Sequence, residues 1–141
     1  MEMTKMLHTF SASAAAMEQS VRRGERDPQE VLLDYAQMYS SFFESCPQMI
    51  DIWIHAAALK PEEEDSKLFQ QIVRERKNGI ASLLENIGNI NQERAETLAS
   101  ALMDLLTAKM IWWKFNGGHF SLEESFRRSV EFLLLNKWQV I

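Results

Sequence analysis

The chain has 141 residues, a formal net charge of -5 and a sequence pI of about 5.2, and 46% of its residues are hydrophobic. These totals fit one globular domain with a sizeable core, and the acidic balance excludes a general affinity for nucleic-acid phosphates. No uncharged apolar run reaches the roughly 20 residues of a membrane span, and a single cysteine cannot form an internal disulfide. We therefore expect residues 1–141 to form one cytoplasmic domain that does not cross a membrane.

Helical periodicity predicts three helices in the first 59 residues. The first runs from about Met3 to Arg23 and ends at Gly24. The second is opened by Asp27-Pro28-Gln29-Glu30, in which a capping Asp precedes a Pro at the first helical position. The third, from about Pro47 to Leu59, is apolar nearly all round, which is typical of a helix that other helices surround.

The remaining residues predict one long helix and a terminal hairpin of two more. The long helix extends from about Ser66 to Ile87, and Gly88-Asn89 ends it. Within the hairpin, Asn91 to Trp138, the sequence Asn116-Gly117-Gly118 ends the first helix and Ser121-Leu122-Glu123-Glu124 caps the second. The prediction is an all-α fold of six helices with no strand.

The terminal hairpin has more apolar surface than one domain can cover. The apolar arc of its first helix is much wider than the stripe of roughly 100° that one packing surface needs. We expect one edge to pack on its own domain and the other on a second copy, so that the last two helices form an intermolecular four-helix bundle in a homodimer. The predicted interface is apolar and comes from both helices: Leu98, Ala101, Leu105, Trp112, Phe126, Val130, Phe132, Leu133 and Leu135.

Three features resemble the C-terminal half of tetracycline-repressor-type (TetR family) transcriptional regulators. They are the aromatic-rich stretch Tyr35 to Met49 that breaks before Pro47, the long helix ending in Gly-Asn, and the terminal hairpin. The resemblance covers about Met3 to Trp138. It implies that the last two helices dimerise and that the preceding helices enclose a pocket for a small ligand.

One part of that family pattern is missing from these residues. No short helix, turn with Gly and basic recognition helix precedes the first helix. Either the chain is a fragment of a longer regulator, or it kept only the sensing and dimerising half. We expect an effector-binding and dimerisation domain that does not bind DNA by itself. The alternative is a stand-alone dimeric helical interaction protein that binds a protein partner, such as a full-length relative.

The candidate pocket residues are mainly aromatic, thioether and charged groups on helix stripes. The aromatic and thioether residues either line a pocket or belong to the core; a bare stripe favours the core, and the resemblance makes the pocket as good an interpretation. Arg76 and Lys109 fall on apolar helix faces, where an unpaired charge costs several kcal/mol. Either they bind an acidic group of a ligand, or they pair with Asp51 or Glu44 or reach solvent along their own stems. The resemblance and these charges predict a small, largely apolar and possibly acidic ligand, held by Tyr35, Met38, Tyr39, Phe42, Trp53, His55, Arg76, Met103, Leu106, Lys109 and Met110.

Motifs for catalysis and metal binding do not occur in the sequence. It contains no Gly-rich phosphate loop, no Gly-x-Ser-x-Gly and no Cys-x-x-Cys. Asp51 and His55 lie four residues apart, and an intrahelical hydrogen bond is favoured over a metal site, which needs more ligands at fixed spacing. Cys46 has no paired base in the sequence. We expect no enzyme activity, no metal and no cofactor.

Overall fold

In the computed structural model of the protein, the described residues are 2–58, 60, 62–88 and 90–136, and they form six helices and no strand. None of the described helices is long and apolar enough to cross a lipid bilayer. The expected all-α class and the order of the six helices are confirmed, although the predicted end of the hairpin at Trp138 lies outside the described residues. The helices are α1 (Glu2–Arg22), α2 (Pro28–Ser45), α3 (Gln48–Ala58), α4 (Glu64–Ile87), α5 (Gln92–Phe115) and α6 (Leu122–Asn136).

Local capping explains where three of the helices begin. The side chains of Asp27, Asn91 and Ser121 each accept a hydrogen bond from the backbone N–H three residues later, at 3.1, 2.8 and 3.1 Å. Such bonds satisfy donors that have no partner inside the helix. Beyond the end of α5, Gly117 and Gly118 take φ values of 66° and 74°, which favour glycine. The turn between α5 and α6 is therefore specified by its own residues.

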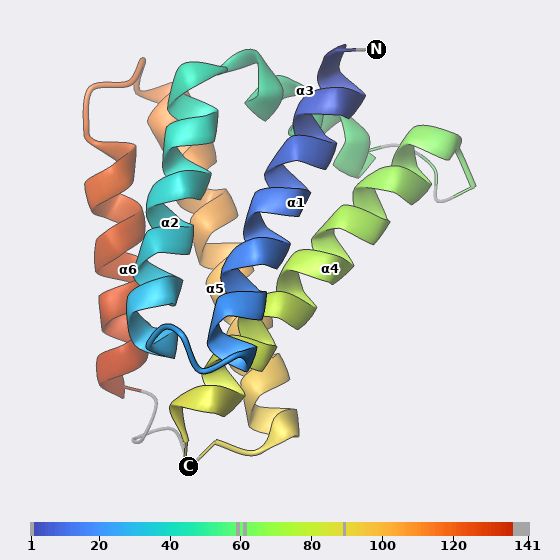
Figure 1. The fold of residues 1–141 in the computed structure, drawn as a ribbon. Coiled ribbons are helices and arrows are strands. Elements are labelled where there is room, and N and C mark those ends of the chain that lie inside the picture. Colours follow the sequence, from blue (N-terminus) through green and yellow to red (C-terminus); the bar gives the residue numbers. More distant parts are fainter. Residues whose placement is uncertain (1, 59, 61, 89, 137–141) are drawn as a thin grey trace.

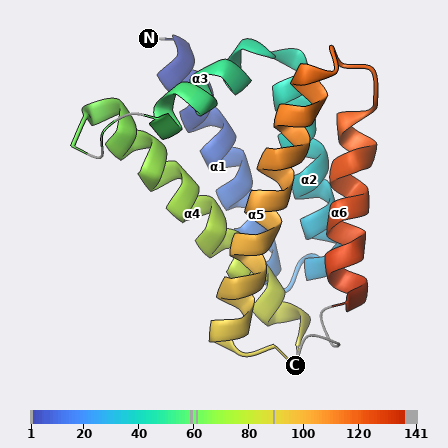
Figure 2. The ribbon, with the colours of Figure 1, turned by 180° about the vertical axis from the view of Figure 1, so that it is seen from behind.

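The helices form a bundle with α3 across one end (Figure 1). In the interior, α2 packs against α6, α1 and α4, and α4 packs against α5 as well as α1. From behind, α5 lies in front, between α4 and α6, and α4 diverges from it toward α3 (Figure 2). No other described helix lies over the outer side of α5 and α6 in that view.

The buried residues form one cluster, and aromatic rings link its helices. The ring of Tyr39 on α2 has its centroid 5.4 Å from Phe10 on α1, 5.0 Å from Phe43 and 5.5 Å from Phe126 on α6. Each of these rings is at least nine-tenths buried. Aromatic pairs at such distances contribute about 0.5–1.5 kcal/mol beyond the burial of their area. Tyr39 is therefore at the centre of the core.

Candidate functional site

One outer face of α5 and α6 carries exposed apolar side chains, and we call it the α5/α6 face. On α5 these residues alternate at spacings of four and three, the seven-residue repeat with which one helix packs along another. Trp112 is 63% exposed, and Leu135 of α6 is 72% exposed. The exposed apolar residues of the face are Ala101, Leu105, Ala108, Trp112 and Phe115 on α5, and Phe132 and Leu135 on α6.

The structure divides the predicted interface residues into two groups. Ala101, Leu105, Trp112, Phe132 and Leu135 are exposed on the α5/α6 face. The others face inward: Leu98, Phe126 and Val130 are buried in the core of their own chain, and Leu133 is half-buried against it.

The residues of the inward-facing group lie in the core of their own chain and not on the exposed face where the sequence analysis expected them, and the cause is simple. The clearest apolar stripe of α6 packs on α2, as the contact between the rings of Phe126 and Tyr39 shows. The residues off that stripe, Phe132 and Leu135, are the exposed ones. Ala108 and Phe115 are also exposed on this face although the sequence prediction did not include them, and the four-three spacing was the available signal.

Lys109 lies on the α5/α6 face and not in a pocket with the other predicted ligand-binding residues. It is half-buried in a hollow of about 440 Å³ whose walls include Leu105, Phe120 and Phe132. The hollow also contains Arg128, which donates a hydrogen bond to Glu124 at 2.6 Å, so its charges have both signs. Lys109 lies at the centre of the wide apolar arc of α5. Part of that arc packs inside the chain and part forms the α5/α6 face, and Lys109 belongs to the second part.

Arg76, the other predicted ligand-binding cation, has a partner within the chain. Its Nη1 donates to Oε1 of Glu18 at 3.2 Å, and the two side chains are only 4% and 9% exposed. The partner comes from α1, so neither Asp51 nor Glu44 has the role that the sequence suggested. Burial raises the pKa of Glu18, and the charge of Arg76 acts against that rise. Arg76 therefore needs no ligand to compensate its charge.

A glycine of α4 makes room for this ion pair. A Cβ atom placed on Gly79 would lie 1.9 Å from Oε1 of Glu18, so no larger residue fits without displacing the carboxylate. Nearby, the hydroxyls of Tyr35 and Tyr39 are buried; burial raises the pKa of both, and the guanidinium of Arg76 acts against that rise. The α1/α4 contact is thus a buried polar region next to the aromatic core.

The structure does not bring the predicted pocket residues together. Tyr35, Tyr39, Leu106 and Met110 are fully buried core residues, whereas His55 is exposed. Apart from Arg76 and Lys109, the others line two separate hollows. Met38 and Phe42 line one of about 630 Å³ between α1 and α2, and Trp53 and Met103 line one of about 430 Å³ between α3, α4 and α5.

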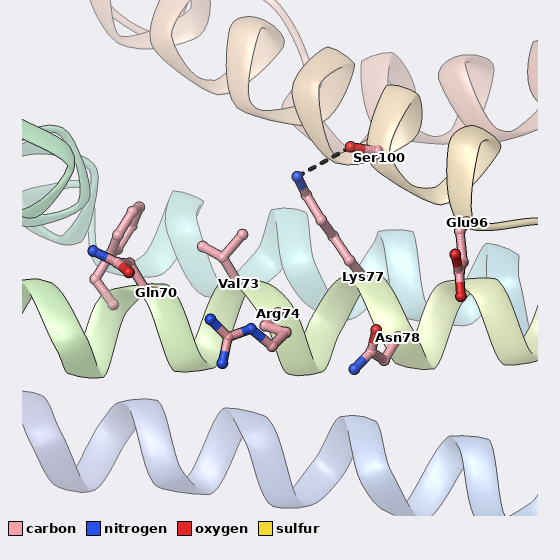
Figure 3. Close-up of a pocket in the computed structure, with 8 residues that line it drawn as sticks. Gln70, Val73, Arg74, Lys77, Asn78, Glu96 and Ser100 are labelled. Carbon is pink, nitrogen blue, oxygen red and sulfur yellow. Dashed lines mark hydrogen bonds between the residues drawn. The ribbon is translucent and has the colours of Figure 1, made fainter. Parts of the chain in front are cut away.

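The second of these hollows continues along α4 and α5, and we call the whole the α4/α5 groove. A neighbouring hollow of about 520 Å³ shares Phe69, Val73 and Lys77 with it. Lys77 reaches from α4 across to α5 and donates to Oγ of Ser100 at 3.1 Å (Figure 3). Lys77 was not among the predicted ligand-binding residues. Its position beside the stripe of α4, one residue after Arg76, was the available signal.

The remaining predicted polar site is also rearranged. Oδ2 of Asp51 accepts a hydrogen bond from Nζ of Lys114 on α5, in place of the expected bond within α3 to His55. In the part of the chain that the structure describes, no group of three or more His, Cys, Asp and Glu side chains could hold a metal ion.

Comparisons with known proteins add no assignment to these surfaces. No protein-family model matches the chain, and neither a curated protein nor a solved structure shows significant similarity to it.

Proposed function

We propose that this chain is the effector-binding and dimerisation half of a TetR-type transcriptional regulator. The observation that carries the proposal is the α5/α6 face, where Leu105 and Trp112 of α5 and Leu135 of the neighbouring helix α6 are exposed. Large exposed apolar side chains gathered on one face are typical of an interaction site. A second copy related by a two-fold axis removes both faces from water at once, since each face packs against its equivalent.

The charges on the face are compatible with self-association. A face of one sign would repel its own copy, but the hollow around Lys109 also contains Glu124 and Arg128. Trp112 and Leu135 supply the apolar anchors around which interface energy concentrates. The proposed interface is therefore an apolar seam with a mixed polar rim.

The sensing part of the proposal depends on the packing between α4 and α5. The inner side of α5 packs on α4, and its outer side forms the α5/α6 face. A ligand that binds one arrangement of α4 and α5 better than another shifts the population toward that arrangement. Because α5 belongs to both surfaces, the shift changes the geometry of the dimer, which is the coupling that an effector-controlled regulator needs.

The function is tested by asking whether the chain can dimerise a DNA-binding unit. We expect that fusing it to a monomeric helix-turn-helix domain restores repression at an operator with two half-sites, because dimeric binding needs two linked units. Leu105→Glu should abolish the repression. The matched control is Ala16→Glu, which places the same charge on an exposed apolar residue of α1, outside both the α5/α6 face and the α4/α5 groove, and should leave repression intact.

Two results would contradict the proposal. One is a fusion that is folded and abundant but does not repress. The other is repression that Leu105→Glu leaves unchanged. If the isolated chain fails to self-associate and instead binds a full-length relative through the α5/α6 face, the interaction-protein alternative replaces the dimeric regulator domain.

A further inference from the structure

The α4/α5 groove changes in character along its length. Near α3 its walls are mainly apolar and include Trp53, Phe69, Val73, Met103 and Ile111. Toward the other end the walls become polar, with side chains of Arg74, Asn78, Glu96 and Ser100 (Figure 3). The two parts, of about 430 and 520 Å³, are each within the size range of small-molecule sites.

Lys77 lies at the junction of the two parts and lines both of them. Lys77 is half-buried. Arg74, which lies one turn earlier on α4, is exposed. The hydroxyl of Ser100 gives the Lys77 ammonium a hydrogen bond but no compensating charge. Within the described residues, no carboxylate lies within 4.0 Å of the charged nitrogens of Lys77 or Arg74.

Two acidic side chains also line the groove, and neither forms an ion pair with Lys77. Glu96, in the polar part, accepts a hydrogen bond from Gln92 at 3.2 Å, and Asp104, in the other part, is exposed on α5. Lys77 thus differs from Arg76, one residue earlier, which has the carboxylate of Glu18. A half-buried ammonium next to an apolar channel favours a ligand with a negative head and an apolar body.

We propose that the α4/α5 groove binds an elongated apolar carboxylic acid, with its carboxylate on Lys77 and its tail between Trp53, Val73 and Met103. The ligand carboxylate accepts the charge-assisted hydrogen bond that Ser100 cannot match, with Arg74 adding a second positive charge at the groove mouth. The tail displaces water from the apolar walls beneath α3. This inference names the ligand class of the proposed sensor and rests on the proposed function only for the consequence of binding.

Decanoate and its neutral amide, decanamide, test the proposal by isothermal titration calorimetry on the full chain. We expect one decanoate site per chain, and we expect decanamide to bind at least about tenfold more weakly because it lacks the charge. Lys77→Met should remove that preference. Val73→Gln should weaken both compounds, because it places an amide in the apolar wall.

The matched control is Lys67→Met, which removes another ammonium of α4, outside both the groove and the α5/α6 face. It should leave decanoate affinity unchanged. Equal affinities for acid and amide, or a preference that Lys67→Met removes and Lys77→Met does not, would overturn the proposed site.

The same samples separate the two proposals. Acid-selective binding by a chain that sediments as a monomer would support the groove and contradict the dimeric function. A dimer without acid-selective binding would contradict the groove alone.

Discussion

The α1/α4 contact and the α5/α6 face are opposite departures from the usual division between core and surface. In the first, the charged groups of Glu18 and Arg76 are buried. In the second, large apolar groups such as Trp112 and Leu135 are exposed. In the α1/α4 contact the chain itself compensates the buried charges, because the two groups lie 3.2 Å apart. No described helix covers the α5/α6 face, so we propose that a second copy of the chain covers it.

The comparison shows that an unusual residue in a stripe has no fixed meaning. Arg76 suggested a ligand, and the structure gives it Glu18. Lys109 suggested the same pocket, and the structure places it on the α5/α6 face. What decides the meaning is the charge or surface that the rest of the fold brings opposite each residue.

The largest expected effect concerns the buried ion pair. Arg76→Met leaves the Glu18 carboxylate buried without its partner, and we expect a loss of about 3–5 kcal/mol in the free energy of unfolding, measured by urea denaturation at fixed protein concentration. The double variant Glu18→Leu with Arg76→Met should recover most of that loss, because no buried charge then remains. A single variant as stable as the parent would show that the pair is not buried in solution.

The next effect concerns the space that Gly79 leaves for the carboxylate. In an ordinary helix interior, Gly→Ala stabilises by roughly 0.5–1 kcal/mol. Here the new methyl group meets Glu18, so we expect Gly79→Ala to destabilise the protein by about 1–3 kcal/mol. In a Glu18→Ala background the same change should become neutral or stabilising. A stabilising effect in the parent chain would contradict the close approach of α1 and α4.

The pH dependence of stability sharpens the comparison further. Because the folded pKa of Glu18 is raised above 4.5, the folded state binds a proton more readily than the unfolded state. The contribution of Glu18 to stability is therefore greatest at low pH and falls as pH rises through the folded pKa. Arg76→Met removes the positive charge that lowers the pKa of Glu18, so the folded pKa of Glu18 becomes higher still.

We therefore expect the stability difference between the parent and Arg76→Met to shrink as the pH falls toward the ordinary carboxyl range, because protonation of Glu18 then removes its uncompensated charge. Arg76→Met combined with Glu18→Gln should not show this change. A difference independent of pH in both variants would mean that Glu18 is not the titrating group.

The smallest effect concerns an ion pair that joins α3 and α5 at the surface. Lys114 bonds to Asp51, but their side chains remain 32% and 63% exposed, so solvent screens the interaction. We expect Lys114→Met to change the free energy of unfolding by at most about 0.5–1 kcal/mol. A loss as large as that of Arg76→Met would remove the distinction between buried and exposed pairs.

Local features of the fold could be predicted from the sequence, because their causes are local. Asp27 before Pro28 and Ser121 before Leu122 cap helices where the pattern placed them. The exposed positions Leu105 and Trp112 followed from an apolar arc too wide for one neighbour. Such signals are contained in a few consecutive residues.

Long-range pairing could not be predicted in the same way. Glu18 and Arg76 are 58 residues apart, and only the packing of α1 on α4 brings them together. Glu18 lies between Ala14 and Val21 on the buried side of α1, and Arg76 lies in the apolar stripe of α4. A negative charge in one stripe and a positive charge in the other were the available clue. Phe126 was assigned to the dimer because periodicity reveals an apolar side without revealing what covers it.

Sedimentation equilibrium of the parent chain tests the α5/α6 face most directly. One chain has a mass of 16.4 kDa. A two-fold dimer with an apolar interface of standard size, about 1,600 Å² in total, should give twice that mass at micromolar concentration. Leu105→Glu should return the protein to the mass of a single folded chain. A folded parent that sediments as one chain across the micromolar range would contradict the proposal that this face binds a second copy.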